Sequence, residues 1–230
     1  MKSVRMIVVA ALAVAMSGLV ASTARAGASA EAGGGFSGSF PIGDWGELTG
    51  FGLGLENSTT IFTDPTKPLG IRSGSSLMYN FPRTVDVPAA NLAPGTALRT
   101  ETANVSWWLG IGPTFQKHTG NARPFVYGTI GVNVSWIDSH LKGNVNGANY
   151  DATVGQTSTT FAWTAGAGLS KKASSVPGGR LGINVEYRSF VGQNYLLPGD
   201  VTSSGSAVFW DRSSRNADQI VVRIGIMNDV

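Results

Sequence analysis

The sequence predicts an all-β protein, an eight-stranded antiparallel up-and-down transmembrane β-barrel that follows a cleaved signal peptide. Three observations predict this fold. Apolar and polar residues alternate in eight segments, the connections between these segments alternate between long and short, and charged residues make up only 13% of the chain. Soluble domains usually carry about twice that share of charge. Membrane-spanning barrels have long loops at one end and short turns at the other.

Residues 1–26 have the pattern of a secretory signal peptide. Lys2 and Arg5 form a positive start, residues 6–20 are almost entirely apolar, and an Ala-Arg-Ala cleavage site closes the segment. The apolar run is short and rich in small residues, which favours a cleaved signal over an uncleaved anchor. The predicted barrel domain then covers 27–230, although a cut after Ala30 is an alternative.

The charge balance of the mature chain excludes one class of partner. Removal of the signal takes three of the 17 basic residues and none of the 14 acidic ones, so the mature chain is neutral. A neutral chain has no basic footprint for nucleic acid, and we expect no nucleic-acid partner. The chain has no cysteine, so its stability must come from packing and backbone hydrogen bonds rather than disulfides.

Eight segments with alternating polarity are the expected strands. In chain order they are 33–41, 50–62, 69–82, 103–116, 123–137, 158–171, 180–193 and 217–228. Most exceed the usual length of a soluble strand, and a tilted membrane-spanning strand needs about 9–11 residues. Their lengths therefore favour a membrane-spanning barrel.

The connections between these strands also fall in chain order. The odd-numbered connections are 42–49, 83–102, 138–157 and 194–216, and the even-numbered ones are 63–68, 117–122 and 172–179. The first connection is modest, the other odd ones are long, and all even ones are short. An up-and-down barrel with both chain ends in the periplasm predicts this alternation, whereas a soluble Greek-key sandwich does not.

A short glycine-containing pattern occurs three times along the chain, as a weak internal repeat. The stretch "GFGLGL" at 50–55 places glycines two residues apart on one face, and "WLGIGP" at 108–113 and "TAGAGL" at 164–169 repeat the arrangement. Strand glycines usually cost stability. The lumen of an eight-stranded barrel is only wide enough for side chains, so these glycines are expected to relieve crowding on the inward face.

The stretch "RPFVYGTIGVNVSWID" at 123–138 decides which face points outward. Its even positions include the apolar Val126, Ile130, Val132, Val134 and Trp136, and its odd positions include the small or polar Thr129, Gly131, Asn133 and Ser135. The later strands repeat the pattern, and their polar faces include Glu186, Arg188 and Arg223. Unpaired charges are too costly for a sandwich core, so the apolar face is expected to face lipid. A soluble sandwich or lipocalin-like binder is the alternative.

A network of charges is expected inside the barrel. Its members are Glu56, Arg72, Glu186, Arg188 and Arg223. One interpretation is a salt-bridged plug, and the other is a narrow gated passage whose charges set selectivity. Large inward side chains at Met78, Trp108 and Met227 are expected to obstruct such a passage.

Aromatic residues on outward faces are expected to contact the lipid interface. They are Tyr79, Trp107, Trp136, Trp163 and Tyr187. Aromatic girdles of this kind flank the apolar band of membrane barrels, although ordinary strand aromatics account for part of the pattern.

No enzyme and no cofactor are suggested. The two histidines are His118, in a short turn, and His140, in a long loop. His140 follows Asp138 and Ser139, but adjacent residues of an extended chain point alternately and form no triad. No cysteine or histidine pair has the spacing of a metal site, so no metal is expected.

Several motifs make the chain resemble small outer-membrane β-barrel proteins of the OmpA/OmpX/OmpW-like class, across nearly all of 33–230. These motifs are "FPIGDW", "GFGLGLE", "RPFVYGTIGVNVSW", "FAWTAGAGLSKK" and "RLGINVEYRSF". The resemblance implies a monomer in the outer membrane of a Gram-negative cell. Its implied partners are membrane lipid, lipopolysaccharide and the outer-membrane assembly machinery. Such barrels usually end in an aromatic residue, whereas this chain ends in Val230.

The expected function is a structural or surface-interaction role through loops 83–102, 138–157 and 194–216. An extracellular ligand or surface partner would bind there. The second hypothesis is a small passive channel for ions or small solutes. The third and most distant is an outer-membrane lipid-modifying enzyme. The motifs specify a fold and name no ligand.

Overall fold

The computed structural model describes residues 29–64, 66–117, 119–173 and 179–229. The expected signal peptide, His118 and Val230 lie outside these ranges, so the expectations about them stay predictions. In the part of the chain that is described, no helix is both long and apolar enough to cross a membrane, a finding that has no bearing on strands.

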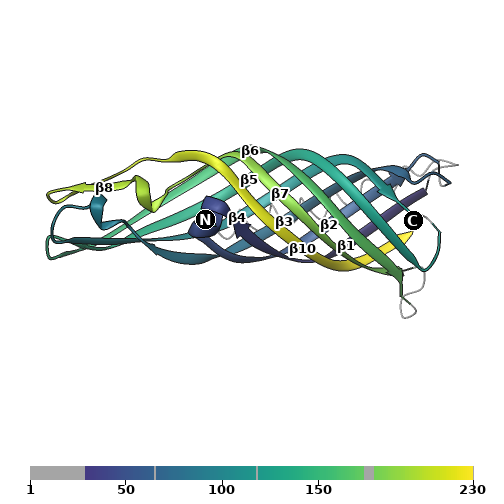
Figure 1. Cartoon of the computed structure of the whole chain (residues 1–230), viewed down its shortest axis with the longest axis horizontal. Coiled ribbons are helices and arrows are strands. Elements are labelled where there is room, and N and C mark those ends of the chain that lie inside the picture. Colours follow the sequence, from purple (N-terminus) through teal and green to yellow (C-terminus); the bar gives the residue numbers. More distant parts are fainter. Residues whose placement is uncertain (1–28, 65, 118, 174–178, 230) are drawn as a thin grey trace, which may run out of the picture.

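Eight long antiparallel strands close into one barrel, as the alternation predicts (Figure 1). They are β1 (Ser29–Ile42), β2 (Thr49–Phe62), β3 (Leu69–Asp86), β4 (Thr96–Gln116), β5 (Ala122–Val145), β6 (Ala148–Lys172), β7 (Gly179–Tyr195) and β10 (Ser213–Asp229). Each strand pairs with its neighbour in the chain, except that β7 pairs with β10 across an intervening hairpin. The barrel closes where β10 pairs with β1. The predicted fold class is confirmed.

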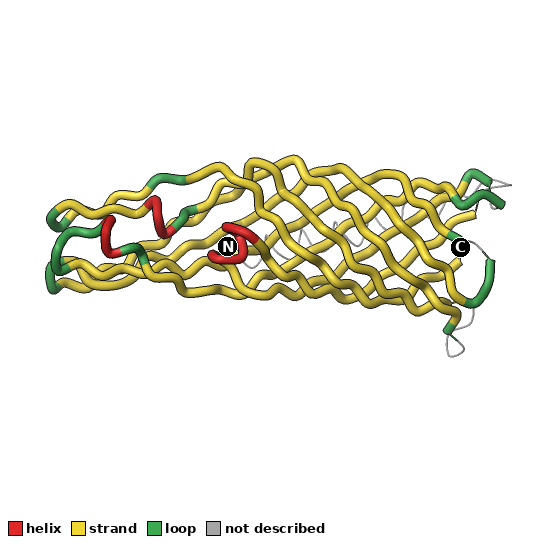
Figure 2. The backbone as a smooth tube through the Cα atoms, viewed as in Figure 1, coloured by secondary structure: helices red, strands yellow, loops and turns green. Residues whose placement is uncertain are grey.

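The connections at the two ends of the barrel differ, as Figure 2 shows. Short turns join the strands at the end where β1 starts and β10 finishes. The opposite end, which the sequence analysis expects to face outward and which is called the outward end below, carries the remaining elements. They are α2 (Gly43–Leu48), η2 (Ala89–Asn91), η3 (Pro198–Asp200) and the hairpin β8 (Val201–Ser204) with β9 (Ala207–Trp210). The sequence predicted no helix. The six residues of α2 are too few for a periodic pattern to emerge.

All three predicted long loops, 83–102, 138–157 and 194–216, are wrong in their extent, because barrel strands continue into them. The largest difference is at 138–157. β5 and β6 stay paired up to Val145 and Ala148, and only Asn146 and Gly147 turn. Both have positive φ, 52° and 85°, as a two-residue type I′ hairpin requires. The polar, glycine-rich composition of 138–157 indicated a loop. In the structure, the backbone N–H and C=O groups of this segment are instead paired between β5 and β6.

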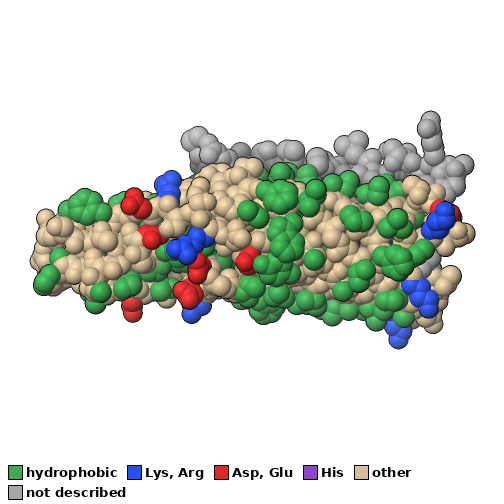
Figure 3. Space-filling model, turned by 45° about the horizontal axis from the view of Figure 1, so that its top comes forward, with side chains coloured by type: hydrophobic (Ala, Val, Ile, Leu, Met, Phe, Trp, Pro, Cys, Tyr) green, Lys and Arg blue, Asp and Glu red, His purple; other side chains and the backbone are tan. Residues whose placement is uncertain are grey.

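The outer face of the barrel is apolar. Figure 3 shows hydrophobic side chains covering the barrel wall, with charged side chains gathered at the borders of this belt. Leu55 and Ile130 are each 59% exposed, and Ile183 is 48% exposed. A soluble protein rarely exposes so large a contiguous apolar surface. The belt therefore faces lipid, and the soluble sandwich or lipocalin-like alternative is excluded.

We expect Ile130→Arg, in the belt portion of β5, to lower the free energy of unfolding by about 2–4 kcal/mol, because a guanidinium near the bilayer midplane loses its hydration. Urea unfolding in lipid vesicles measures the effect. Asn149→Arg, at the exposed tip of β6, is the control and should stay within about 0.5 kcal/mol. Equal losses in the two variants would contradict the lipid-facing belt.

Candidate functional site

The centre of the lumen is an arginine held by two glutamates. Arg188 is fully buried, and its Nη2 forms an ion pair with Glu56 Oε1 at 2.8 Å and another with Glu186 Oε1. Nη1 donates to Ser76 Oγ at 2.6 Å, and the guanidinium lies 4.6 Å from the Trp108 ring centroid. These contacts join β2, β3, β4 and β7 across the lumen.

A tyrosine extends this cluster to β5. Tyr127 Oη donates to Glu186 Oε2 at 2.5 Å and accepts from Asn184 Nδ2 at 2.7 Å. The phenol lies against Gly166 of β6, where an added Cβ would come within 2.6 Å of Tyr127 Cζ. The glycine of the "TAGAGL" repeat therefore makes the close approach possible, as expected from the crowded lumen.

The other two residues of the expected charge network are not ion-paired. Arg72 lies over the ring of Tyr127, 4.5 Å from its centroid. Arg223 Nη1 donates to Ser58 Oγ at 2.9 Å. Within the described ranges neither forms a salt bridge, so ion pairs join only three of the five residues. All five are buried.

Above the central cluster, α2 folds into the mouth of the barrel. Trp45 and Leu48 are 2% and 1% exposed. Trp45 packs against Tyr195 with ring centroids 5.4 Å apart. The buried cluster around them also contains Trp108, Ile137, Ala162, Phe190 and Ala217. This plug was not predicted from the sequence, where its only signal is the pair of apolar residues three apart in "GDWGEL".

Polar contacts fasten α2 to the rim. Thr49 Oγ1 donates to the Trp45 carbonyl at 3.2 Å, and Arg83 Nη1 donates to the Gly46 carbonyl at 2.5 Å. Asp44 forms a half-exposed ion pair with Arg215 at 2.9 Å. Such exposed pairs contribute little, so apolar burial holds the helix.

The end of the lumen with the short turns is also bridged. Glu31 of β1 binds Arg123 of β5 at 2.6 Å and accepts from Gln116 Nε2 at 2.7 Å. Arg123 also contacts Asp229 of β10 at 3.1 Å. Strands β1 and β5 lie on opposite sides of the ring, so these bonds cross the floor of the barrel. Side chains thus fill the lumen at three levels.

The outward end contains its own apolar core beyond the lumen. Its buried members are Val87, Leu98, Leu141, Val145, Val154, Leu196 and Val201. Two hydrogen bonds tie the connection after β3 to the connection after β7. Asn91 Nδ2 donates to the Gly199 carbonyl at 2.8 Å, and the Ala93 N–H donates to Ser203 Oγ at 2.7 Å. The outward connections therefore form one folded body.

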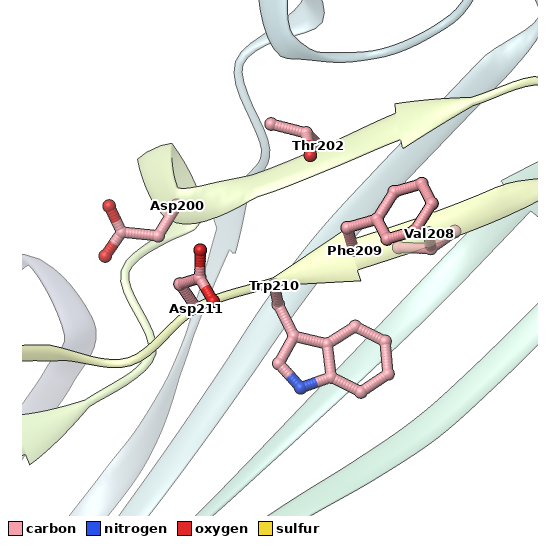
Figure 4. Close-up of a pocket in the computed structure, with 6 residues that line it drawn as sticks. All are labelled: Asp200, Thr202, Val208, Phe209, Trp210 and Asp211. Carbon is pink, nitrogen blue, oxygen red and sulfur yellow. The ribbon is translucent and has the colours of Figure 1, made fainter.

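An open pocket of about 450 Å³ lies on this body, at the β8–β9 hairpin (Figure 4). Its lining is Asp200, Thr202, Val208, Phe209, Trp210 and Asp211. The Phe209 side chain is 57% exposed. Asp200 also accepts a hydrogen bond from Ser213 Oγ. The pocket presents carboxylates beside exposed aromatic surface, which is a suitable combination for contact with a partner.

Comparisons with known proteins support the fold through structure rather than sequence. No protein-family model matches the chain, and a search of curated proteins found no match. A major outer membrane protein from Thermus thermophilus aligns with a TM-score of 0.50 at 13% identity, over 87% of this chain and 99% of that one. The fold is that of a small outer-membrane β-barrel.

Two further solved barrels align less closely. OprG from Pseudomonas aeruginosa has a TM-score of 0.49 at 12% identity, covering 89% of this chain and 96% of that one. Ail of Yersinia pestis, solved with the heparin analogue sucrose octasulfate, has a TM-score of 0.45 at 12% identity, covering 89% and 99%.

The five expected interface aromatics lie on the outer wall of this outer-membrane barrel. Trp163 and Tyr187 form a tilted pair with centroids 5.1 Å apart. Tyr79 packs edge-on against Phe81 at 5.2 Å. Trp107 and Trp136 lie on β4 and β5 and are partly exposed. Their depth in the bilayer stays a prediction.

The Asp-Ser-His stretch at 138–140 is part of β5 rather than a loop. Ser139 points inward, is 2% exposed and shares a hydrogen bond with Thr102. His140 points outward, with its Nδ1 3.1 Å from Thr153 Oγ1. Because the serine and the histidine lie on opposite faces of the wall, this stretch cannot act as a catalytic pair.

Proposed function

We propose that this outer-membrane barrel is closed to solutes and acts through its outward end, as a structural or surface-contact protein. The observation that carries the proposal is the filling of the lumen at three levels, by α2, by the Arg188 cluster and by the Glu31 floor. If the filled lumen passes no solutes, the folded body formed by the outward connections is the part of the protein available for interaction. We further propose export through a signal peptide and no enzymatic role.

The outward body supports a contact role. Its apolar core and cross-connections limit the freedom of the hairpin, and preorganised surfaces lose less entropy when they bind. The pocket beside Asp200 and Asp211 adds negative charge next to the exposed Phe209 ring. Cationic groups are attracted to both carboxylates and aromatic faces, so a partner with cationic groups suits this surface.

The second candidate function is a small passive channel. Arg72 and Arg223 favour it, because unpaired arginines in a lumen attract anions. A channel would require α2, the Arg188 cluster and the floor all to move aside. We propose it only as the alternative, because the contacts described above tie each of these three levels to the wall.

We expect the full-length protein to insert into a planar bilayer without discrete conductance steps. Insertion is checked independently by protease protection in the same lipid. Reproducible unitary steps would overturn the closed barrel and support the channel. An Arg223→Glu variant that reversed the ion selectivity of such steps would assign the passage to the lumen.

An epitope tag tests the proposed orientation. We expect a tag inserted at Gly205, in the exposed turn between β8 and β9, to be labelled by antibody on intact cells. The matched control is a tag at Gly120, an exposed position in the short turn between β4 and β5, which should be labelled only after permeabilisation. Labelling of the Gly120 tag but not the Gly205 tag on intact cells would contradict the proposed surface role.

A further inference from the structure

Charge is distributed unevenly along the barrel axis. The end with the short turns has the basic residues Lys67, Lys117, Arg123, Lys171, Lys172 and Arg180 and the acidic residues Glu31, Asp64 and Asp229. The lumen network holds three arginines and two glutamates, so the outward end has the other five of the 14 basic and nine of the 14 acidic residues of 27–230. Figure 3 shows basic side chains, in blue, gathered at the end with the short turns. The barrel is therefore basic at one end and acidic at the other.

Three lysines of the basic end form no ion pair with any described residue. They are Lys117, which follows β4, and Lys171 and Lys172, which end β6, and all three are exposed. The acids of the floor are already engaged, because Glu31 and Asp229 both contact Arg123. The third acid, Asp64, pairs with Lys67 in another turn. The described part of the chain therefore supplies no counter-charge to these three ammonium groups.

The lysines lie where the apolar belt ends. Lys171 follows Leu169 on the outward face of β6 and pairs in register with Leu181 of β7. Lys117 comes two residues after Phe115 of β4. The three apolar side chains are 43%, 55% and 58% exposed. Two residues of a strand span about 6–7 Å, and lysine side chains near a membrane border extend to the headgroups, so these ammonium groups reach the level of lipid phosphates.

The two strand ends that carry these lysines are close to one another. The Lys117 N–H donates to the Pro124 carbonyl at 3.1 Å, and the Lys172 N–H donates to the Asn121 carbonyl at 3.0 Å. Both acceptors flank the start of β5, so only this strand separates the lysines. Neighbouring strands lie about 4.8 Å apart, a spacing that lets long side chains from both strand ends reach one phosphate. We name Lys117, Lys171 and Lys172 the lysine patch.

We propose that the lysine patch binds the headgroup phosphate of an anionic phospholipid, of the phosphatidylglycerol class, in the leaflet next to the short turns. Continuity with the belt favours a lipid over a soluble anion, because the acyl chains cover Leu169 and Phe115 while the phosphate meets the lysines. The acidic outward end repels such headgroups, so the charge asymmetry confines them to one leaflet. The choice of phospholipid over lipopolysaccharide rests on the proposed orientation, which the tags at Gly205 and Gly120 test separately.

Lipid titration followed by native mass spectrometry tests the patch. The full-length protein in detergent is titrated with phosphatidylglycerol or with zwitterionic phosphatidylcholine of the same acyl chains. One basic residue near an anionic lipid is worth about fivefold in affinity. We therefore expect the combination of Lys117→Gln, Lys171→Gln and Lys172→Gln to weaken phosphatidylglycerol binding about a hundredfold and to leave phosphatidylcholine binding unchanged.

The matched control combines Arg99→Gln, Lys142→Gln and Arg212→Gln, which remove the same charge from the outward end. It should change phosphatidylglycerol affinity by less than about twofold, because charges beyond a Debye length are screened. A second measurement uses vesicles of phosphatidylcholine with and without phosphatidylglycerol. We expect phosphatidylglycerol to raise the urea midpoint of the unmodified protein but not that of the triple lysine variant.

Three results would overturn the lysine patch. One is equal affinity of the unmodified protein for the two lipids. Another is phosphatidylglycerol binding by the triple lysine variant that is as tight as that of the unmodified protein. The third is an equal loss of binding in the outward control variant, which would assign the effect to net charge rather than to these three lysines.

Discussion

We expect Arg188→Met to lower the free energy of unfolding by about 3–5 kcal/mol, which is the usual cost of removing one partner from a buried ion pair. The guanidinium is the shared partner of Glu56 and Glu186. Its loss leaves both carboxylates buried and adjacent to one another. Urea unfolding of the barrel in lipid vesicles, followed by tryptophan fluorescence, measures the change.

A variant that lacks all three ion-paired charges separates the ion pairs from simple packing. In the combination of Glu56→Gln, Glu186→Gln and Arg188→Met, no buried charge is left unpaired in the cluster. Replacing a whole buried ion pair by neutral residues is often close to neutral, so we expect the combination to recover most of the lost stability. A triple variant as unstable as Arg188→Met alone would show that packing around the arginine, and not charge, holds the lumen.

The second large effect is expected at the mouth of the barrel. Trp45→Ala removes the largest buried side chain of α2, and Trp→Ala changes in cores cost about 3–5 kcal/mol. The barrel wall should persist while α2 opens locally. A glutamate-specific protease that cuts after the exposed Glu47 should then act about a hundredfold faster, because cleavage follows the open population.

The control for this measurement is Ile42→Ala. Ile42 precedes α2 in the chain but is 38% exposed, so its truncation should change the cleavage rate by less than about threefold. Cleavage of Trp45→Ala at the unmodified rate would mean that α2 is held by its rim contacts, those of Arg83 and Arg215, rather than by apolar burial.

The strands of the barrel wall could be predicted from the sequence, whereas most contacts inside the lumen could not. All eight strands were predicted, and the faces assigned to Ile130, Trp108 and Arg188 agree with their exposure. The extent of the outward strands was underestimated, because "GNVNGANYD" has the composition of a loop. The hairpin there depends on two residues with positive φ, Asn146 and Gly147. The composition of this stretch does not show how β5 and β6 pair residue by residue.

The strands, their two faces and the lipid-facing side follow from the order of residues along the chain, because side-chain alternation is a property of the local backbone with a period of two. Which inward groups meet depends instead on the closed barrel. Glu56 and Arg188 are 132 residues apart, and barrel closure alone brings them within 2.8 Å. Glu186 already lies two residues from Arg188 on β7, so closure supplied only the second carboxylate of this cluster. The same closure left Arg223 without an ion pair and formed the mouth that Trp45 fills.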